Sequence, residues 1–189
     1  MKTEKGSAGY VKYQQRVRTI RTVILFAVVF AVFIAGLVIY GGDRRNICSI
    51  AAAVLCIPAA MSAVSMIMMW MRKPVSESFA EEVRKLAGDA RVLMELYVTT
   101  SEHGLYLHAA VIRDGRVIGY APEARSAAAF HSVSAHIRKA LEESCGPVEV
   151  TITRNFEEFR EQTDELAALQ TENPELQDEI AQVLLSLSL

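Results

Sequence analysis

The stretch "IYGGDRRNICSI", residues 39–50, is a polar interruption between two long apolar runs. Residues 22–40, "TVILFAVVFAVFIAGLVIY", and residues 47–71, "ICSIAAAVLCIPAAMSAVSMIMMWM", contain no Asp, Glu, Lys, Arg or His. A helix of about 20 apolar residues crosses the roughly 30 Å hydrocarbon core of a bilayer. The sequence therefore predicts two transmembrane helices, residues 22–40 and 47–71, joined by a loop at residues 41–46.

The short loop forces these helices into an antiparallel hairpin with both outer ends on one side of the membrane. Lys and Arg near the membrane ends set the orientation, because they accumulate on the cytoplasmic side. Residues 1–21 contain six of them, Arg72 and Lys73 follow the second run, and the loop offers only Arg44 and Arg45. We expect a cell-membrane protein with cytoplasmic N- and C-termini and a basic cytoplasmic tail, residues 1–21.

The first run has an alternative interpretation, a cleaved secretory signal peptide. The apolar part of a signal peptide is normally about 7–15 residues long. This run has 19 residues, and a second apolar run follows almost at once. Two retained membrane helices are therefore the preferred prediction.

The basic tail predicts the lipid bilayer as a partner of this protein. Tyr10, Tyr13, Val17 and Ile20 recur at helical spacing with basic residues around them. The tail either lies as an amphipathic helix on the anionic inner leaflet or stays a disordered basic segment.

Small side chains recur every four residues in both apolar runs, a spacing that lets helix backbones approach closely. We expect the two ridges to face each other within the hairpin, and the same ridges are candidates for packing in a homodimer. The candidate helix-packing residues are Ala27, Ala31 and Ala35 in the first run and Ala52, Cys56 and Ala60 in the second.

Residues 72–77 read as a linker, and residues 78–189 read as a soluble domain. Ser78 and Glu81 form a capping-box pattern before a helix that Gly88 closes. Residues 92–100 and 105–121 then predict three strands, the last two joined at Asp114-Gly115, a strong signal for a two-residue hairpin turn. Pro122 is expected to open the next helix.

The rest of the domain predicts one more strand and two more helices. "VEVTIT", residues 148–153, alternates apolar and polar side chains, as a strand buried on one face does. Asn155 and Asn173 are expected to cap helices that cover the C-terminal part. The order α-β-β-β-α-β-α-α predicts an α+β fold, in which a mixed four-stranded sheet and its helices form two layers.

The α-β-β-β-α-β order over roughly residues 78–153 resembles the core of restriction-endonuclease-like nucleases. That resemblance implies acidic metal ligands and a lysine on a central strand. Residues 116–121, "RVIGYA", contain neither, and the domain is net negative, which disfavours a nucleic-acid partner. A degenerate nuclease-like domain without its catalytic residues is the form of this alternative that we keep.

No other pattern in the chain indicates catalysis. There is no glycine-rich phosphate loop or Gly-x-Ser-x-Gly elbow, and no cluster of His and Cys has metal-ligand spacing. His131 and His136 are five residues apart on a predicted helix and point in different directions. We therefore predict no catalytic residue, cofactor or metal, and lean toward a protein that is not an enzyme.

Negative charge accumulates near the C-terminus. Residues 155–179 hold nine acidic residues against Arg160 alone, a net charge of −8, and we expect the helices of residues 155–189 to form one acidic pair. Such a surface can dock a basic partner by electrostatic complementarity, or act only as a solvated face. The candidate partner-binding residues are Glu157, Glu158, Glu161, Asp164 and Glu165.

"KGSAGYVKYQQRVRTIR" at residues 5–21, two apolar helices, and "CIPAAMSAVSMIMM" at residues 56–69 resemble small two-helix membrane proteins of anaerobic Gram-positive bacteria. Members of that group are sometimes labelled "O-linked GlcNAc transferase-like". The label implies a membrane-tethered enzyme that acts on a sugar or nucleotide, and we keep this as the alternative. The preferred hypothesis is a non-enzymatic, membrane-anchored protein-interaction or regulatory module.

Overall fold

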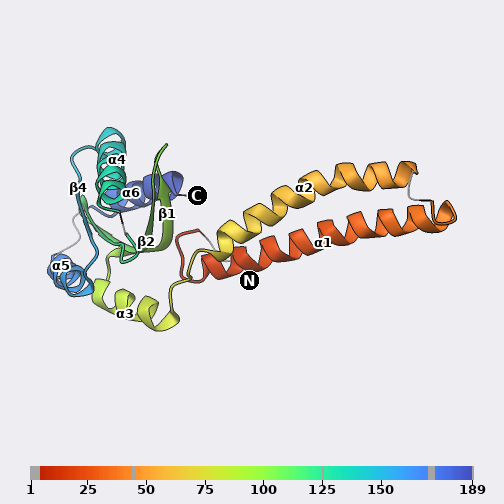
Figure 1. Cartoon of the computed structure of the whole chain (residues 1–189). Helices are drawn as coiled ribbons and strands as arrows, with labels where there is room; N and C mark the ends of the chain where they lie inside the picture. The colour runs from red at the N-terminus through yellow and green to blue at the C-terminus, as the bar shows by residue number, and fades with distance from the viewer. Residues whose placement is uncertain (1–4, 44–45, 125, 170–172, 189) are drawn as a thin grey trace. The chain divides into compact units, whose positions relative to one another are not determined.

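The computed structural model describes residues 5–43, 46–124, 126–169 and 173–188. The chain divides into two compact units. Val11–Lys73 form a helical hairpin, whereas the residues from Pro74 onward form an α+β domain to which residues 5–10 also belong (Figure 1). Arg44 and Arg45, the basic residues of the predicted loop, lie outside the described residues.

The hairpin consists of α1 (Tyr10–Ile39) and α2 (Ile47–Trp70). Both helices are long and apolar enough to cross a membrane by length and composition, as predicted. α1 begins well before its apolar run, so residues 10–21 of the basic segment are helical and continuous with the first candidate span. Asn46 caps α2, because its side-chain oxygen accepts a hydrogen bond from the Ser49 backbone N–H at 2.8 Å.

Polar contacts align the two helices of the hairpin in register. The hydroxyl groups of Thr22 and Ser62 lie 2.8 Å apart, and Gln15 Nε2 donates to the carbonyl oxygens of Met69 and Arg72 at 3.2 and 2.9 Å. The part of α2 that follows Ser62 therefore lies beside the charged N-terminal third of α1. This alignment explains why the second apolar run is longer than the first.

The domain contains a mixed four-stranded sheet of α+β type, as predicted (Figure 1). Its strands are β1 (Arg91–Thr99), β2 (Gly104–Arg113), β3 (Arg116–Tyr120) and β4 (Glu149–Thr153), and they lie side by side in that order. β1, β2 and β3 pair antiparallel, and β4 pairs parallel to β3. Asp114 and Gly115 both have positive φ, 43° and 77°, which is the backbone of the tight hairpin turn that their sequence predicts.

Within the described part of the domain, four helices cover the sheet: α3 (Glu77–Ala87), α4 (Ala127–Cys145), α5 (Phe156–Ala168) and α6 (Pro174–Leu187). Two helix starts differ from the prediction. Ser76, not Ser78, caps α3 by accepting from the Phe79 N–H, and Ser126 caps α4, which therefore begins after Pro122. In each case the helix starts after the serine whose hydroxyl oxygen accepts a hydrogen bond from the backbone N–H three residues later.

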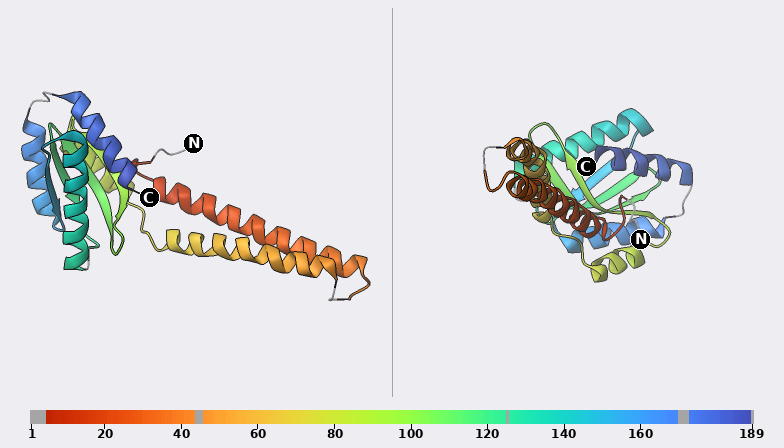
Figure 2. Two further views of the ribbon diagram at one scale, coloured as in Figure 1. Left: turned by 90° about the horizontal axis from the view of Figure 1, so that it is seen from above. Right: turned by 90° about the vertical axis from the view of Figure 1, so that its right-hand side faces the viewer.

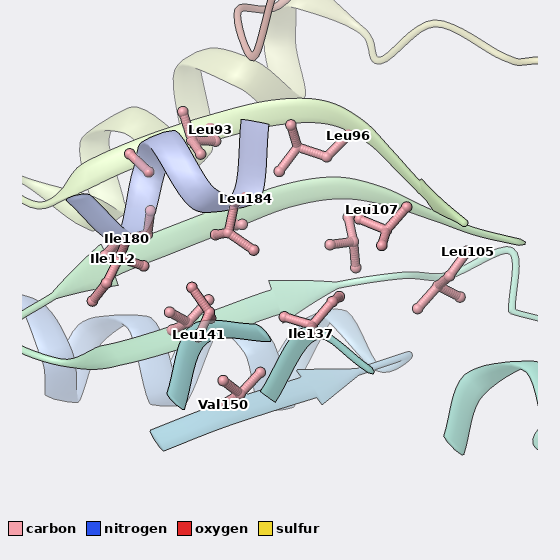
Figure 3. Close-up of a cluster of buried hydrophobic side chains, with 14 of the residues drawn as sticks. Leu93, Leu96, Leu105, Leu107, Ile112, Ile137, Leu141, Val150, Ile180 and Leu184 are labelled. Carbon is pink, nitrogen blue, oxygen red and sulfur yellow. The ribbon is translucent and has the colours of Figure 1, made fainter. Parts of the chain in front are cut away.

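Two separate apolar cores lie on the two faces of the sheet. One joins the sheet to α4 and α6, and Figure 3 shows Leu141 and Leu184 from these helices pointing at the same layer of strand side chains. The other joins Ala109 and Val111 of β2 to α3 and α5. The views of Figure 2 show the helices set around the strands.

Helices on both faces give three layers rather than the two expected from the sequence. The reason is visible in β1 and β2, whose side chains are buried in near-continuous runs instead of alternating. A strand buried on both faces needs apolar partners on both. Only β4, with its alternating sequence, suggested a single buried face.

Residues 5–8 are part of the domain. The Met94 N–H of β1 donates to the Gly6 carbonyl at 2.7 Å, and Lys5 Nζ donates to the carbonyl oxygens of Leu185 and Ser188 at the end of α6. A cation suits the negative end of a helix dipole. Gly6 has φ +85°, and a Cβ there would lie 2.8 Å from Leu185 Cδ2, so glycine fits this close approach.

Candidate functional site

The predicted partner-binding carboxylates form one continuous stripe on α5. The positions 157, 158, 161, 164 and 165 recur at helical spacing, and all five side chains are exposed. The opposite side of the helix is buried through Phe159, Thr163 and Leu166. The structure therefore brings these five residues together on a solvent-facing surface, which we call the α5 acidic face.

Local contacts hold the start of this helix. Asn155 is its N-cap and accepts a hydrogen bond from the Glu157 N–H at 3.1 Å, while Thr153 Oγ1 donates to Glu158 Oε2 at 2.6 Å. Glu157 and Glu158 lie in the first turn, where carboxylates stabilise the positive end of the helix dipole. Glu158 thus has a structural partner, whereas within the described part of the chain no ion pair involves any of the five carboxylates.

The acidity does not form one surface, because α5 and α6 cover opposite faces of the sheet. The expectation of a single acidic pair is corrected on this point. On α6, Asp178 lies 3.8 Å from Arg91, so part of that charge is neutralised locally. Among the described residues, the five carboxylates of the α5 acidic face form no such ion pair.

A small groove borders this face. It has a volume of about 190 Å³ and is lined by Glu165 and Gln162 of α5 and by the ion pair of Arg116 with Glu149, whose charged atoms are 3.1 Å apart. Small-molecule pockets usually start at roughly 300 Å³. The groove is therefore smaller than an ordinary small-molecule pocket.

The predicted helix-packing residues are distributed differently from the expectation. Of the six, Ala52 is buried between the helices, whereas Ala27, Ala31, Ala35, Cys56 and Ala60 are exposed on the hairpin. The seam instead contains Thr22, Val29 and Gly36 at seven-residue spacing, with Ala52 and Ala59 of α2. Two antiparallel helices that pack along their whole length contact each other through positions seven residues apart. A row of positions four residues apart winds around the helix and leaves this contact line within two turns.

Sequence reasoning missed an aromatic cluster on the sheet face under α3 and α5. His108 of β2 lies with its ring 5.0 Å from that of Tyr106, 5.9 Å from Tyr120 and 6.3 Å from Phe79. Burial raises the pKa of the Tyr120 hydroxyl. The rings of Phe156 and Phe159 complete the cluster from α5.

Glu95 of β1 occupies an unusual place beside this cluster. It is buried, has φ +56°, and accepts a hydrogen bond from the Val75 N–H at 2.9 Å. Leu93 and Leu96 on either side of it both contribute to the α4–α6 core, so the alternation of β1 shifts by one residue here. The pairing with β2 nevertheless keeps its register. No side-chain pattern in the sequence signals such a shift.

Among the described residues, no group of three or more His, Cys, Asp and Glu side chains is placed to hold a metal ion. His131 and His136 are exposed on α4, and Cys145 is half-buried at its end. Compared with family models, with curated proteins and with solved structures, the chain finds no match.

Proposed function

We propose that this protein is a membrane-anchored module that binds a protein partner with a basic surface through the α5 acidic face. The observation that carries the proposal is the stripe of five exposed carboxylates on one side of α5, none of which forms an ion pair within the described residues. Exposed charge of one sign steers and orients an oppositely charged partner. The small volume of the neighbouring groove favours a macromolecular partner over a metabolite.

The test is affinity capture and crosslinking of the full-length protein from its native membrane, with bound proteins quantified by mass spectrometry. The variant Glu157→Gln, Glu161→Gln, Asp164→Asn removes three charges from the α5 acidic face and spares Glu158, which holds Thr153. We expect it to reduce capture by about tenfold or more, and capture by the unaltered protein to weaken as salt rises.

The matched control lies on the opposite sheet face. Glu175→Gln, Asp178→Asn, Glu179→Gln removes the same number of charges from α6. If capture falls equally in both variants, it depends on net charge alone. If capture is unchanged in the α5 variant, the α5 acidic face does not bind the partner.

The orientation of the protein is part of the proposal. Residues 5–8 contact β1 and α6, so the chain leaves the domain before α1 and returns to it after α2. With both helices in a membrane, the two ends of the hairpin then lie on the same side. The excess of Lys and Arg in residues 1–21 and 72–73 assigns that side to the cytoplasm.

A further inference from the structure

A groove of about 470 Å³ runs between the two helices of the hairpin, near their outer ends. Each helix contributes one stripe at positions i, i+3, i+4 and i+7, so the groove follows the line where the helices meet. Its lining residues are Gln14, Val17, Arg18 and Arg21 of α1 and Pro58, Met61, Ser62 and Ser65 of α2. Two of these eight are cationic and none is acidic.

The two arginines differ in how firmly they are held. Arg18 is half-buried, and its Nη1 donates to Ser65 Oγ at 2.6 Å and to the Ser65 carbonyl at 3.4 Å. One nitrogen is thereby fixed, and the guanidinium retains further N–H donors. Arg21 is exposed one turn along the same stripe. Within the described residues, no carboxylate forms an ion pair with either guanidinium.

The sequence beside the groove indicates how deep in a membrane the groove would lie. Thr22 is the first residue of the uncharged run, and its hydroxyl pairs with that of Ser62. If α1 crosses a bilayer through that run, Arg18 and Arg21 stand at the boundary where the hydrocarbon ends and lipid phosphates begin. Val17, Met61 and Pro58 give the same groove an apolar wall, as an acyl chain next to a phosphate requires.

We propose that this groove binds the phosphate group of an anionic glycerophospholipid, with Arg18 and Arg21 as its ligands. A guanidinium donates two parallel N–H bonds to phosphate oxygens, and the Ser65 contact orients Arg18 for this geometry before the lipid arrives. The volume lies within the roughly 300–1,000 Å³ of ordinary ligand sites. The inference rests on the proposed membrane insertion, but not on the partner-binding role of α5.

The experiment uses the full-length protein in mild detergent and counts bound lipid by native mass spectrometry. Phosphatidylglycerol and phosphatidylcholine of equal chain length compete for the protein. We expect a preference for phosphatidylglycerol of at least tenfold, and its loss in the variant Arg18→Gln, Arg21→Gln. The matched control, Lys12→Gln, Arg16→Gln, removes the same charge from α1 at a different cavity beside Trp70 and should keep the preference.

The remaining arms separate the alternatives. Arg18→Lys, Arg21→Lys keeps the charge but removes the paired donors, so the preference for phosphatidylglycerol should fall only in part. If circular dichroism shows that the glutamine variant is misfolded, this lysine variant tests the role of the two arginines in its place. Equal loss in the Lys12 and Arg16 control means diffuse attraction and overturns the site. Displacement of lipid by glycerol 3-phosphate at equal concentration assigns the groove to a soluble phosphate ester and overturns the lipid.

Failure of this proposal is distinguishable from failure of the proposed function. A protein that resists carbonate extraction from membranes but shows no lipid preference lacks the site while keeping its anchor. Loss of partner capture in the α5 variant concerns the domain alone, because none of its substituted residues lines the groove.

Discussion

Cys145 is the single cysteine outside the hairpin, and its surroundings make it a poor nucleophile. Burial at the end of α4 raises the pKa of its thiol, and the carboxylate of Glu179 raises it further. Because the thiolate is the reactive form, a raised pKa lowers the reactive fraction near neutral pH. We expect Cys145 to react with iodoacetamide more slowly than an unfolded peptide thiol at pH 7.5, with the rate still rising above pH 9.

Peptide mapping by mass spectrometry follows Cys145 separately from Cys48 and Cys56. Glu179→Gln should accelerate alkylation, but less than unfolding in urea does, since desolvation is the larger cause. A rate equal to that of the unfolded chain would contradict the assigned environment.

Glu95 gives a second prediction at the scale of one residue. Its carboxylate accepts from the buried Val75 N–H, so Glu95→Ala should destabilise the domain by about 1–3 kcal/mol, the cost of a buried donor that loses its partner. Glu95→Gln keeps an oxygen at that position and should cost less. Hydrogen exchange of β1 amides in the full-length protein measures both, and equal effects would assign the cost to the backbone at φ +56° instead.

At the scale of the helices, Gly36 lies where α1 closely approaches the start of α2. A Cβ there would lie 2.5 Å from Cys48 Cβ and 2.9 Å from Asn46 Oδ1, the atom that caps α2. Gly36→Leu should therefore separate the helices and weaken the cap, at a cost of about 1–3 kcal/mol. The measurement is thermal loss of helicity in detergent.

The neighbouring residue provides the control for this change. Ala35 is exposed, so Ala35→Leu places the same leucine side chain outside the seam and should leave the melting temperature nearly unchanged. A large shift for Ala35→Leu would instead restore the predicted alanine ridge as a packing surface, against another copy of the chain.

Local sequence patterns encode some of these elements and not others. The two long apolar helices and the turn at Asp114-Gly115 were predictable, because hydrophobic length and positive φ each select particular residue types. The helix seam was not, because it depends on a hydroxyl pair, Thr22 with Ser62, that is forty residues apart in sequence. The shift at Glu95 was also hidden, since a buried carboxylate in an apolar strand has no periodic signature.

At the scale of the whole molecule, the stripe on α5 was predictable because all five carboxylates belong to one helix. The separation of α5 from α6 was not, because it depends on which sheet face each helix covers. The attachment of residues 5–8 to the domain was equally hidden. Gly6 contributes a carbonyl oxygen and Lys5 reaches carbonyl oxygens, so neither contact selects a complementary side chain elsewhere in the sequence.

That attachment leads to the last prediction, on membrane orientation. In a chain whose native cysteines are replaced, Ser101→Cys lies on the exposed turn between β1 and β2, and Gly42→Cys lies in the loop between the helices. A membrane-impermeant maleimide added to intact cells should label Gly42→Cys alone, and label Ser101→Cys only after the membrane is permeabilised. Labelling of Ser101→Cys from outside would place the domain beyond the membrane, where cytoplasmic partners cannot reach the α5 acidic face. Labelling of neither position in intact cells, with both labelled after permeabilisation, would mean that the loop does not reach the far side and that the hairpin does not span the bilayer.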